Sequence, residues 1–352
     1  MATSTKRRPV LLLGSVPLGS ATEVFTAAGT ALGDLARRIP DGETGVRLLW
    51  IGCQAEAFQN AAGLQKTAER QIPGVPAFTL YGFKPGLSAS DVKFGPLGYA
   101  SAAIQSYQDF KRLRDVGTVD RATRLQISLP TPFAVAYSFS ERSAFPALWQ
   151  IYERKMLEEV DEIARAIPHR DLAIQWDIAP EMVEYDTISE RSETIHQLFA
   201  SGIPASKLLA AIVRVSDHVP ADIELGLHFC YGDPGHKHLV EPKTTAPAVE
   251  MANRLASAIR RPITWIHLPV PRGRDDDAYF APLRGLKLKP GTELYLGLVH
   301  ITDGLEGAKR RLAAAQRVVS DFGVATECGL GRRSPGTIPG LLTLHREIAE
   351  LG

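Results

Sequence analysis

Three side chains in the carboxyl-terminal half of the chain are of types that bind soft metal ions. His228 and Cys230 lie two residues apart in the segment LGLHFCYGD, and Cys328 lies in ATECGLGRR. Residues two apart on a β-strand point to the same side, so the imidazole and the thiolate would face together. A second thiolate from a later strand end would complete most of a tetrahedral zinc site. Cysteine is also often buried as a small apolar residue, and the spacing alone leaves this alternative open.

The composition is that of a globular protein with a small-molecule substrate. Of 352 residues, 45% are hydrophobic and 22% are charged, and 40 Lys and Arg balance 39 Asp and Glu. There is no basic excess that would favour binding to nucleic acid or to an anionic membrane. No run of about 18 apolar residues predicts a membrane span. The three widely spaced cysteines do not suggest a disulfide framework, so we expect a reducing, cytoplasmic location.

Short apolar runs alternate with longer segments of helical period along most of the chain. Helical spacing of apolar residues is clear over residues 148–167 and 304–322. Eight β/α units with near-continuous apolar strands predict a closed (β/α)8 TIM barrel, an α/β fold. An open doubly wound sheet has the same alternation, but no G-x-G-x-x-G follows the first strand to support its dinucleotide-binding form. The expected strands are Pro9–Ser15, Leu35–Gly42, Thr123–Pro130, Asp171–Asp177, Asp222–Phe229, Pro262–Leu268, Glu293–Val299 and Gly323–Cys328.

A single catalytic domain is expected after a short tail. Residues 1–8, which include Lys6, Arg7 and Arg8, predict a disordered N-terminal tail, and residues 9–352 predict one barrel. The stretch from about Leu48 to Arg121 does not alternate cleanly, and its LYGFKPG segment has the pattern of a strand and a turn. We interpret this stretch as an insertion between the second and third barrel strands. The sequence carries no signal of the oligomeric state.

Polar and metal-capable residues recur where the expected strands end. In a β/α barrel the carboxyl ends of the strands form one rim, which carries the active site. Such convergence favours a functional site over the ordinary polarity of exposed strand ends. Of the other histidines, His300 could act as a catalytic acid or base, whereas His236 and His238 are more consistent with a solvated loop. The rim residues are Gly14, Ser15, Asp41, Gly42, Glu43, Asp177, His228, Cys230, His267, His300 and Cys328.

Several motifs, taken in order, resemble the catalytic domain of cobalamin-independent methionine synthase. They are GSVP (14–17), DGE (41–43), IQWD (174–177), HFCYG (228–232) and ECGLGRR (327–333). The family shows GSFP-like, GE, IQIDEP-like, H-x-C-Y and DCGLKTR-like segments in the same order. The resemblance extends from about Val10 to Arg333, and the H-x-C with a later C-G-L is its most specific part. The wider superfamily includes uroporphyrinogen decarboxylase and methyltransferases that act on methylcobamides.

The resemblance implies a zinc-dependent methyltransferase of methionine biosynthesis that acts on a thiol. His228, Cys230 and Cys328 would be zinc ligands and would leave one coordination position for the substrate sulfur. A zinc-bound thiol loses its proton near neutral pH, and the thiolate is the methyl acceptor.

The resemblance also implies how an amino-acid thiol such as homocysteine would bind. Gly14 and Ser15 would meet its carboxylate, and Glu43 and Asp177 would meet its ammonium group. The fourth-strand motif continues here as DIAPE where the family has D-E-P, which leaves a different thiol as a rival acceptor.

Two further departures from the family pattern affect the metal and the methyl donor. The family has an additional zinc ligand, a Glu on the sixth strand, and its position falls here near His267. We expect His267 to be either a ligand or a buried histidine with satisfied nitrogens. The N-terminal half of the full-length enzymes, which helps to bind a folate, has no matching segment within these 352 residues. The donor is therefore expected to be a folate, a corrinoid or corrinoid protein, or another small methylated metabolite.

Two other functional classes share parts of this pattern. A metal-free lyase of the uroporphyrinogen decarboxylase type would have the same barrel but would use arginines and an aspartate around a porphyrin. Arg37 and Arg38 precede the rim motif instead of following it, and the H-x-C and C-G-L segments favour the methyltransferase. A zinc storage protein would require a closed site with four protein ligands.

Overall fold

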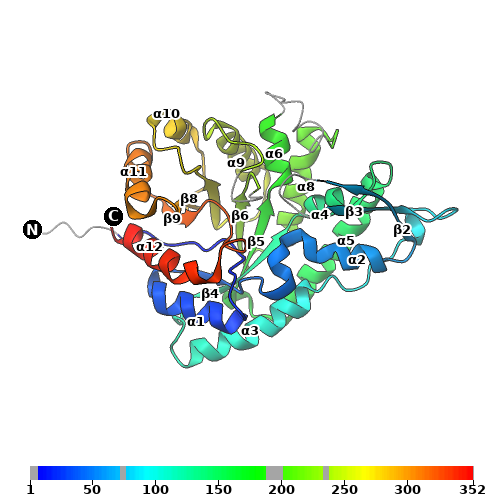
Figure 1. Cartoon of the computed structure of the whole chain (residues 1–352), viewed down its shortest axis with the longest axis horizontal. Coiled ribbons are helices and arrows are strands. Elements are labelled where there is room, and N and C mark those ends of the chain that lie inside the picture. The colour runs from blue at the N-terminus through cyan, green and yellow to red at the C-terminus, as the bar shows by residue number, and fades with distance from the viewer. Residues whose placement is uncertain (1–6, 72–76, 188–200, 233–237, 352) are drawn as a thin grey trace, which may run out of the picture.

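The computed structural model describes residues 7–71, 77–187, 201–232 and 238–351. Its centre is a sheet of seven parallel strands with helices around it (Figure 1). Val10 pairs in parallel with Ala36 on one side and with Val324 on the other, which joins the two edges of the sheet. The fold is a (β/α)8 TIM barrel, as predicted. In sheet order the strands are β1 (Arg38–Pro40), β4 (Arg124–Pro130), β5 (Leu172–Ile178), β6 (Glu224–Phe229), β7 (Trp265–Pro269), β8 (Glu293–Val299) and β9 (Gly323–Thr326).

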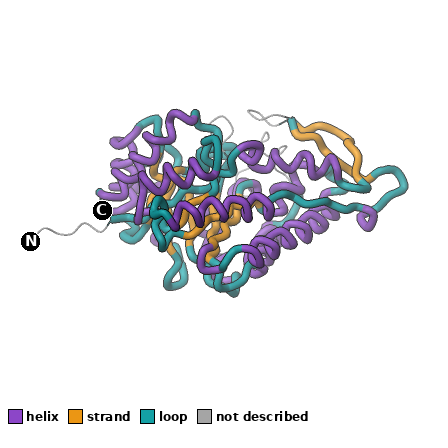
Figure 2. The backbone as a smooth tube through the Cα atoms, turned by 90° about the horizontal axis from the view of Figure 1, so that it is seen from below, coloured by secondary structure: helices purple, strands orange, loops and turns teal. Residues whose placement is uncertain are grey.

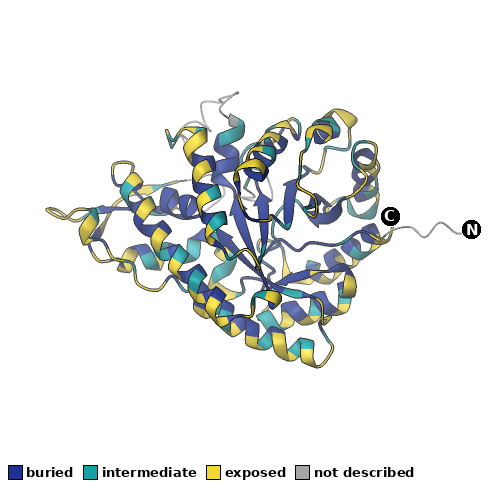
Figure 3. Cartoon of the chain, turned by 180° about the vertical axis from the view of Figure 1, so that it is seen from behind, coloured by how far each residue is buried: buried dark blue, intermediate teal, exposed yellow. Residues whose placement is uncertain are grey.

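Helices follow the strands and cover the outside of the barrel, with buried inner faces and exposed outer faces (Figure 3). In α1, Ser20 caps the amino end by accepting a hydrogen bond from the Glu23 N–H, and Val24, Ala28 and Leu32 recur along the buried face. The α-helices are α1 (Ala21–Leu32), α2 (Ala55–Asn60), α3 (Tyr99–Asp115), α4 (Pro132–Phe139), α5 (Phe145–Ala166), α6 (Pro180–Thr187), α8 (Ala205–His218), α9 (Ala246–Ala258), α10 (Asp277–Phe280), α11 (Gly304–Gln316) and α12 (Ile338–Glu350). The 3₁₀ segments are η1 (Gly33–Leu35), η2 (Gly45–Gln54), η3 (Ala89–Asp91), η4 (His169–Asp171), η6 (Ala281–Gly285) and η7 (Pro335–Thr337).

The insertion predicted between the second and third barrel strands is present. It contains η2, α2 and an antiparallel hairpin of β2 (Leu64–Arg70) and β3 (Phe78–Phe83). The predicted strand and turn at residues 80–86 coincide with the end of this hairpin. Figures 1 and 2 show the hairpin projecting from the barrel on the side away from the two chain ends.

Side chains that alternate along each strand fill two separate apolar clusters. Those that point outward, such as Ile174 and Trp176 of β5, pack with the residues of the surrounding helices. Those that point inward fill the barrel, so its interior is a packed core and not a pore. The inner cluster consists of Leu11, Leu13, Ala173, Trp265, Tyr295 and Ala325.

The first expected strand, Pro9–Ser15, is held to the barrel by side chains as well as by backbone pairing. Beyond the bridges at Val10, its carbonyl groups accept hydrogen bonds from glutamines inside the barrel. Gln126 Nε2 donates to the Leu12 carbonyl at 2.9 Å, and Gln175 Nε2 donates to the Leu13 carbonyl at 2.8 Å. These side-chain amides donate to backbone carbonyls that, in a regular sheet, would accept from the N–H groups of a neighbouring strand.

Ordered packing begins earlier than the sequence suggests. Residues 1–6 of the expected tail lie outside the described residues, but Arg7 pairs with Asp34 and Arg8 is 8% exposed. The Arg8 guanidinium lies 4.0 Å from the centre of the Phe322 ring and donates to the Phe322 carbonyl at 2.9 Å. A planar guanidinium can stack and donate at once, which allows a basic residue to be buried. Within the described ranges, no helix is both long and apolar enough to span a membrane.

Charged groups close the amino-terminal end of the barrel interior. Arg38 of β1 is 2% exposed, and its guanidinium binds Glu224 at the start of β6 and Glu293 at the start of β8. It also lies over the Trp265 ring, 4.4 Å from the ring centre. Burial raises the pKa of Glu293, but the Arg38 guanidinium outweighs this effect and holds that pKa below its usual range. Arg38 therefore neutralises carboxylates from two distant strands.

We predict that Arg38→Met lowers the free energy of unfolding by about 2 kcal/mol at pH 7, because Glu293 and Glu224 lose their buried partner and keep only the more exposed Arg37 and Arg124. Urea denaturation of wild type and variant measures the difference. A lowered folded-state pKa contributes stability that is present above the unfolded pKa and is lost as pH falls through the folded value. The difference in the free energy of unfolding between wild type and variant should therefore become smaller below about pH 4, near the ordinary pKa of Glu. A gap that is constant with pH would contradict the ionic explanation.

Candidate metal and substrate site

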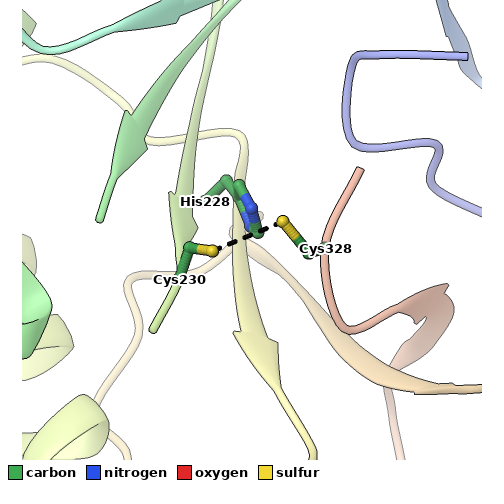
Figure 4. Close-up of side chains that lie close together, drawn as sticks. All are labelled: His228, Cys230 and Cys328. Carbon is green, nitrogen blue, oxygen red and sulfur yellow. Dashed lines mark hydrogen bonds between the residues drawn. The ribbon is translucent and has the colours of Figure 1, made fainter. Parts of the chain in front are cut away.

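Three metal-capable side chains meet at the carboxyl ends of two barrel strands. His228 lies near the end of β6, Cys230 directly follows β6, and Cys328 follows β9. One potential ligand atom from each lies within 4.8 Å of the others, and the two sulfur atoms are 3.4 Å apart. Figure 4 shows the three side chains pointing toward one another. In the part of the chain that the structure describes, this is the one group of three or more His, Cys, Asp or Glu residues whose atoms converge in this way.

His267 lies behind His228. Its Nδ1 is 2.8 Å from Nδ1 of His228, and its Nε2 is 3.0 Å from the carbonyl oxygen of Thr326. Both ring nitrogens are therefore occupied by protein groups. This geometry fits the alternative expectation, a buried histidine with satisfied nitrogens, and departs from the expectation that His267 is a ligand.

The same contacts assign the tautomer of His228 by elimination. A carbonyl can only accept, so His267 Nε2 carries the proton and its Nδ1 is an acceptor. His267 is neutral in this arrangement, since burial and the neighbouring His228 lower its pKa well below the usual range. His228 must then donate from Nδ1, which leaves an unshared electron pair on its Nε2. That nitrogen is the form of imidazole that binds a metal ion.

We predict that His267→Phe weakens zinc binding by about 10- to 100-fold without changing the number of ions bound at saturation, because the ring orients a ligand and does not supply one. Competition with a chromogenic chelator measures the affinity. His345→Phe is a matched control, since His345 is also fully buried but bonds the Leu341 carbonyl within α12. Unchanged affinity in His267→Phe, or a complete loss of the ion, would contradict this role.

The electrostatics around Cys328 favour its thiolate form. The Gly232 N–H donates to Cys230 Sγ at 3.3 Å, and Arg332 Nη2 lies 3.8 Å from Cys328 Sγ. The contact with the Cys230 thiol lowers the pKa of Cys328, burial opposes this, and the Arg332 guanidinium lowers it further, so that it lies well below its usual range. Two thiolates and one imidazole are a donor set that suits zinc and leaves a fourth tetrahedral position. The residues present therefore fit this metal.

The cluster opens onto a cavity of about 160 Å³. The cavity wall is mostly apolar, with a few polar groups placed beside the sulfur atoms, as is usual for small-molecule sites. It is lined by Leu13, Ser15, Glu43, Leu49, Trp50, Ile51, Phe78, Ser138, Asp177, Ala179, Pro180, His228, Cys230, Gly232, Leu239, Cys328, Gly329 and Arg332.

An acidic pair, Glu43 and Asp177, lies in the wall of this cavity. Asp177 Oδ1 accepts a hydrogen bond from Gln175 Nε2 at 2.8 Å, and the Glu43 N–H donates to Asp41 Oδ1 at 2.9 Å. Burial raises the pKa of Asp177 to about 7, and burial and Asp177 raise the pKa of Glu43 well above its usual range. The nearby Arg47 is paired with Asp41, so two buried carboxyl groups in the cavity wall favour a ligand that brings a further positive charge.

Gly14 and Ser15 turn over the rim next to the cluster. Gly14 has φ 136°, a conformation that favours glycine, and a Cβ atom there would lie within a tight 3.2 Å of the Ser128 side chain. The Ser15 carbonyl accepts from the Leu330 N–H at 2.7 Å. Gly329 also packs against Ser15, where a Cβ atom would lie 2.7 Å from the hydroxyl oxygen. Of this pair, Ser15 lines the cavity.

His300 lies near the cluster but does not line the cavity. It is 3% exposed, its Nε2 is 2.9 Å from the Val270 carbonyl, and its Nδ1 is 3.5 Å from Glu327 Oε1. Burial lowers its pKa. His300 therefore contacts Glu327, the residue before Cys328. Because its side chain does not line the cavity, this position does not match the expected role as an acid or base toward substrate.

His238 lies beside the site, although the sequence interpretation predicted a solvated position for it. Its side chain is 2% exposed and lies 3.2 Å from Glu327 Oε2 and 3.1 Å from Glu241 Oε2. Burial lowers the pKa of His238, but Glu241 and Glu327 outweigh this and raise it to about 10. The ion pair joins His238 to Glu327, the residue that precedes Cys328. His236 lies outside the described residues.

Two solved structures share this barrel. A B12-independent methionine synthase from Shewanella sp. W3-18-1, in complex with selenomethionine, superposes with a TM-score of 0.59 and 13% identity over 99% of this chain and 98% of that chain. A methyltransferase from Methanosarcina mazei superposes with a TM-score of 0.54 and 12% identity over 97% and 94%. The fold is shared with a methionine synthase. No protein-family model and no curated protein sequence matches the chain. The resemblance inferred from the motifs is thus confirmed at the level of the fold.

Proposed function

We propose that the protein is a zinc-dependent methyltransferase that methylates the sulfur of an amino-acid thiol, with homocysteine as the first candidate. One observation carries the proposal. The set of His228, Cys230 and Cys328 opens onto the same cavity as the acidic pair of Glu43 and Asp177. A metal that binds sulfur and carboxyl groups that bind an ammonium group are what an amino-acid thiol requires.

Each residue has a separate task in this proposal. Zinc, when bound, supplies the positive charge that keeps the acceptor sulfur as a thiolate at neutral pH. Cys230, Cys328 and Nε2 of His228 would hold it, with His267 fixing the orientation of the imidazole. Glu43 and Asp177 would hold the ammonium group of the acceptor. Gly14 and Ser15 would lie at its carboxylate.

The chemical step is a methyl transfer between two bound molecules. The acceptor thiol gives up its proton, the sulfur–methyl bond forms, and the bond between the methyl group and the donor breaks with its electron pair left on the donor. The residues contribute by holding both partners in line and by excluding water, which supplies much of the rate. The direction of transfer depends on which donor or product is bound.

The apolar part of the cavity wall is the proposed donor side. Leu49, Phe78, Pro180 and Leu239 line it and offer no charge to a donor. A folate, a corrinoid or corrinoid protein, or another small methylated metabolite can present an apolar surface there. The Shewanella protein is described as B12-independent, which supports a donor other than a corrinoid.

A metal-free lyase that acts on a porphyrin is less consistent with this cavity. Among the described residues that line it, Arg332 is the one arginine, and it lies beside Cys328. A substrate with many carboxylates would favour several arginines around the cavity.

We predict about one zinc ion per chain, lost in both Cys230→Ser and Cys328→Ser, because three ligands are too few to spare one. Elemental analysis of the purified proteins measures the metal. Cys53→Ser is the matched control and should retain zinc, since the Cys53 thiol donates to the Trp50 carbonyl instead of facing the cluster. Absence of metal from zinc-supplemented wild type would rule out thiolate activation by zinc.

We also predict that Glu43→Gln and Asp177→Asn raise the KM for homocysteine at least tenfold, because each removes a charged partner of the ammonium group. Zinc content should not change in either variant. Initial rates with methyltetrahydrofolate and with methylcobalamin as donors measure the effect. 4-Mercaptobutyrate, which lacks only the ammonium group, should lose little in the same variants. An equal loss for both thiols would place the two carboxyl groups in another role.

A further inference from the structure

Trp50 has a backbone conformation that its side chain does not favour. Its angles, φ 54° and ψ −119°, are those of the first central position of a type II′ turn, where glycine is the usual residue. A bulky residue with positive φ is a genuine outlier. Such strain persists only where the surroundings enforce it, and it is concentrated at functional sites.

The surroundings of Trp50 enforce this conformation from both ends of η2. On the amino-terminal side, Arg47 forms an ion pair of 2.8 Å with Asp41, whose side chain is 3% exposed. On the carboxyl-terminal side, the Cys53 thiol donates to the Trp50 carbonyl at 2.9 Å. Gln54, which is 2% exposed, donates from Nε2 to the Leu97 carbonyl at 3.1 Å. The turn at Trp50 is therefore held on its amino-terminal side by the contact with Asp41 and on its carboxyl-terminal side by the contact with Leu97.

The Trp50 side chain lies in the wall of the candidate substrate cavity and contacts Asp177, one member of the acidic pair. The ring lines the cavity that also contains His228 and both cysteines. Its Nε1–H donates to Asp177 Oδ2 at 3.3 Å, while Gln175 Nε2 donates to Oδ1 at 2.8 Å. Each oxygen of Asp177 is therefore held by one donor, and the plane of the carboxyl group is fixed from two sides.

We infer that Trp50 is a specificity-determining residue, which orients Asp177 toward the ammonium group of the acceptor and so selects α-amino thiols over thiols that lack this group. The inference rests on the proposed function. A flexible aspartate in a mostly apolar wall would bind the ammonium group with poorer geometry. Trp50 acts through Asp177, so it is a positioning residue, and the strain in η2 is what keeps the indole N–H in place.

The first test separates acceptor selectivity from general damage. Trp50→Phe keeps an aromatic ring in the cavity wall but removes the N–H donor. In the zinc-loaded protein we expect the KM for homocysteine to rise about tenfold, which is the usual effect of one hydrogen bond to a charged group. The kcat, and the KM for 4-mercaptobutyrate, should change less than about twofold. Trp149→Phe makes the same chemical change on α5, outside the cavity, and should leave both thiols unaffected.

The second test addresses the strain and does not depend on the proposed function. Trp50→Gly and Trp50→Ala remove the same ring but differ in their tolerance of positive φ. Glycine ordinarily destabilises a chain relative to alanine, whereas at a strained positive-φ position the order reverses. We expect the Gly variant to unfold about 2 °C above the Ala variant in a thermal scan.

The outcomes distinguish this inference from the proposed function. Failure of the zinc-loaded wild type to bind either thiol would overturn both. Binding of both thiols by wild type, with an equal rise in both KM values in Trp50→Phe, would overturn the inference alone. An Ala variant at least as stable as the Gly variant would show that Trp50 is not held under strain, and this result would also overturn the inference.

Discussion

The parallel register of β5, β6 and β7 fixes the height at which the side chains of the site meet. Asp177 pairs with His228, and His228 pairs with His267, so all three lie at one level of the barrel. Their side chains point the same way because residues in register on neighbouring strands share a face of the sheet. A shift by one residue in either pair would turn one of them into the outer core. The apolar residues on either side of them hold the register by filling the two clusters inside and outside the sheet.

Much of this arrangement was predictable from the sequence, because apolar runs mark buried strands and polar residues mark their ends. His228, Cys230 and Cys328 could be grouped in advance, since each closes such a run. The role of His267 could not be decided. Its residue type fits both a ligand and the support of a ligand, and only the contact with the Thr326 carbonyl separates the two.

Two other residues were not predictable for different physical reasons. Trp50 lies in an apolar segment, whose pattern is that of ordinary buried core. Its positive φ could not be predicted, because the sequence signals a positive φ only where the residue is glycine. His238 follows a glycine- and proline-containing sequence, which is typical of solvated surface, and its burial depends on Glu327, which follows β9 far along the chain. Contacts of this kind depend on how loops fold over the rim, and periodicity carries no information about that.

The three candidate metal ligands come together only when the barrel is closed. His228 and Cys230 belong to β6 and the turn after it, whereas Cys328 follows β9, 98 residues later than Cys230. An ion held by all three therefore acts as a cross-link across a long loop, and its binding energy is added to the folded state only after the last strand is in place. Metal capture would then be a late event in folding. A chain in which β9 has not yet docked would present an unfilled imidazole–thiolate pair, so the complete site is itself a signal that the barrel has closed.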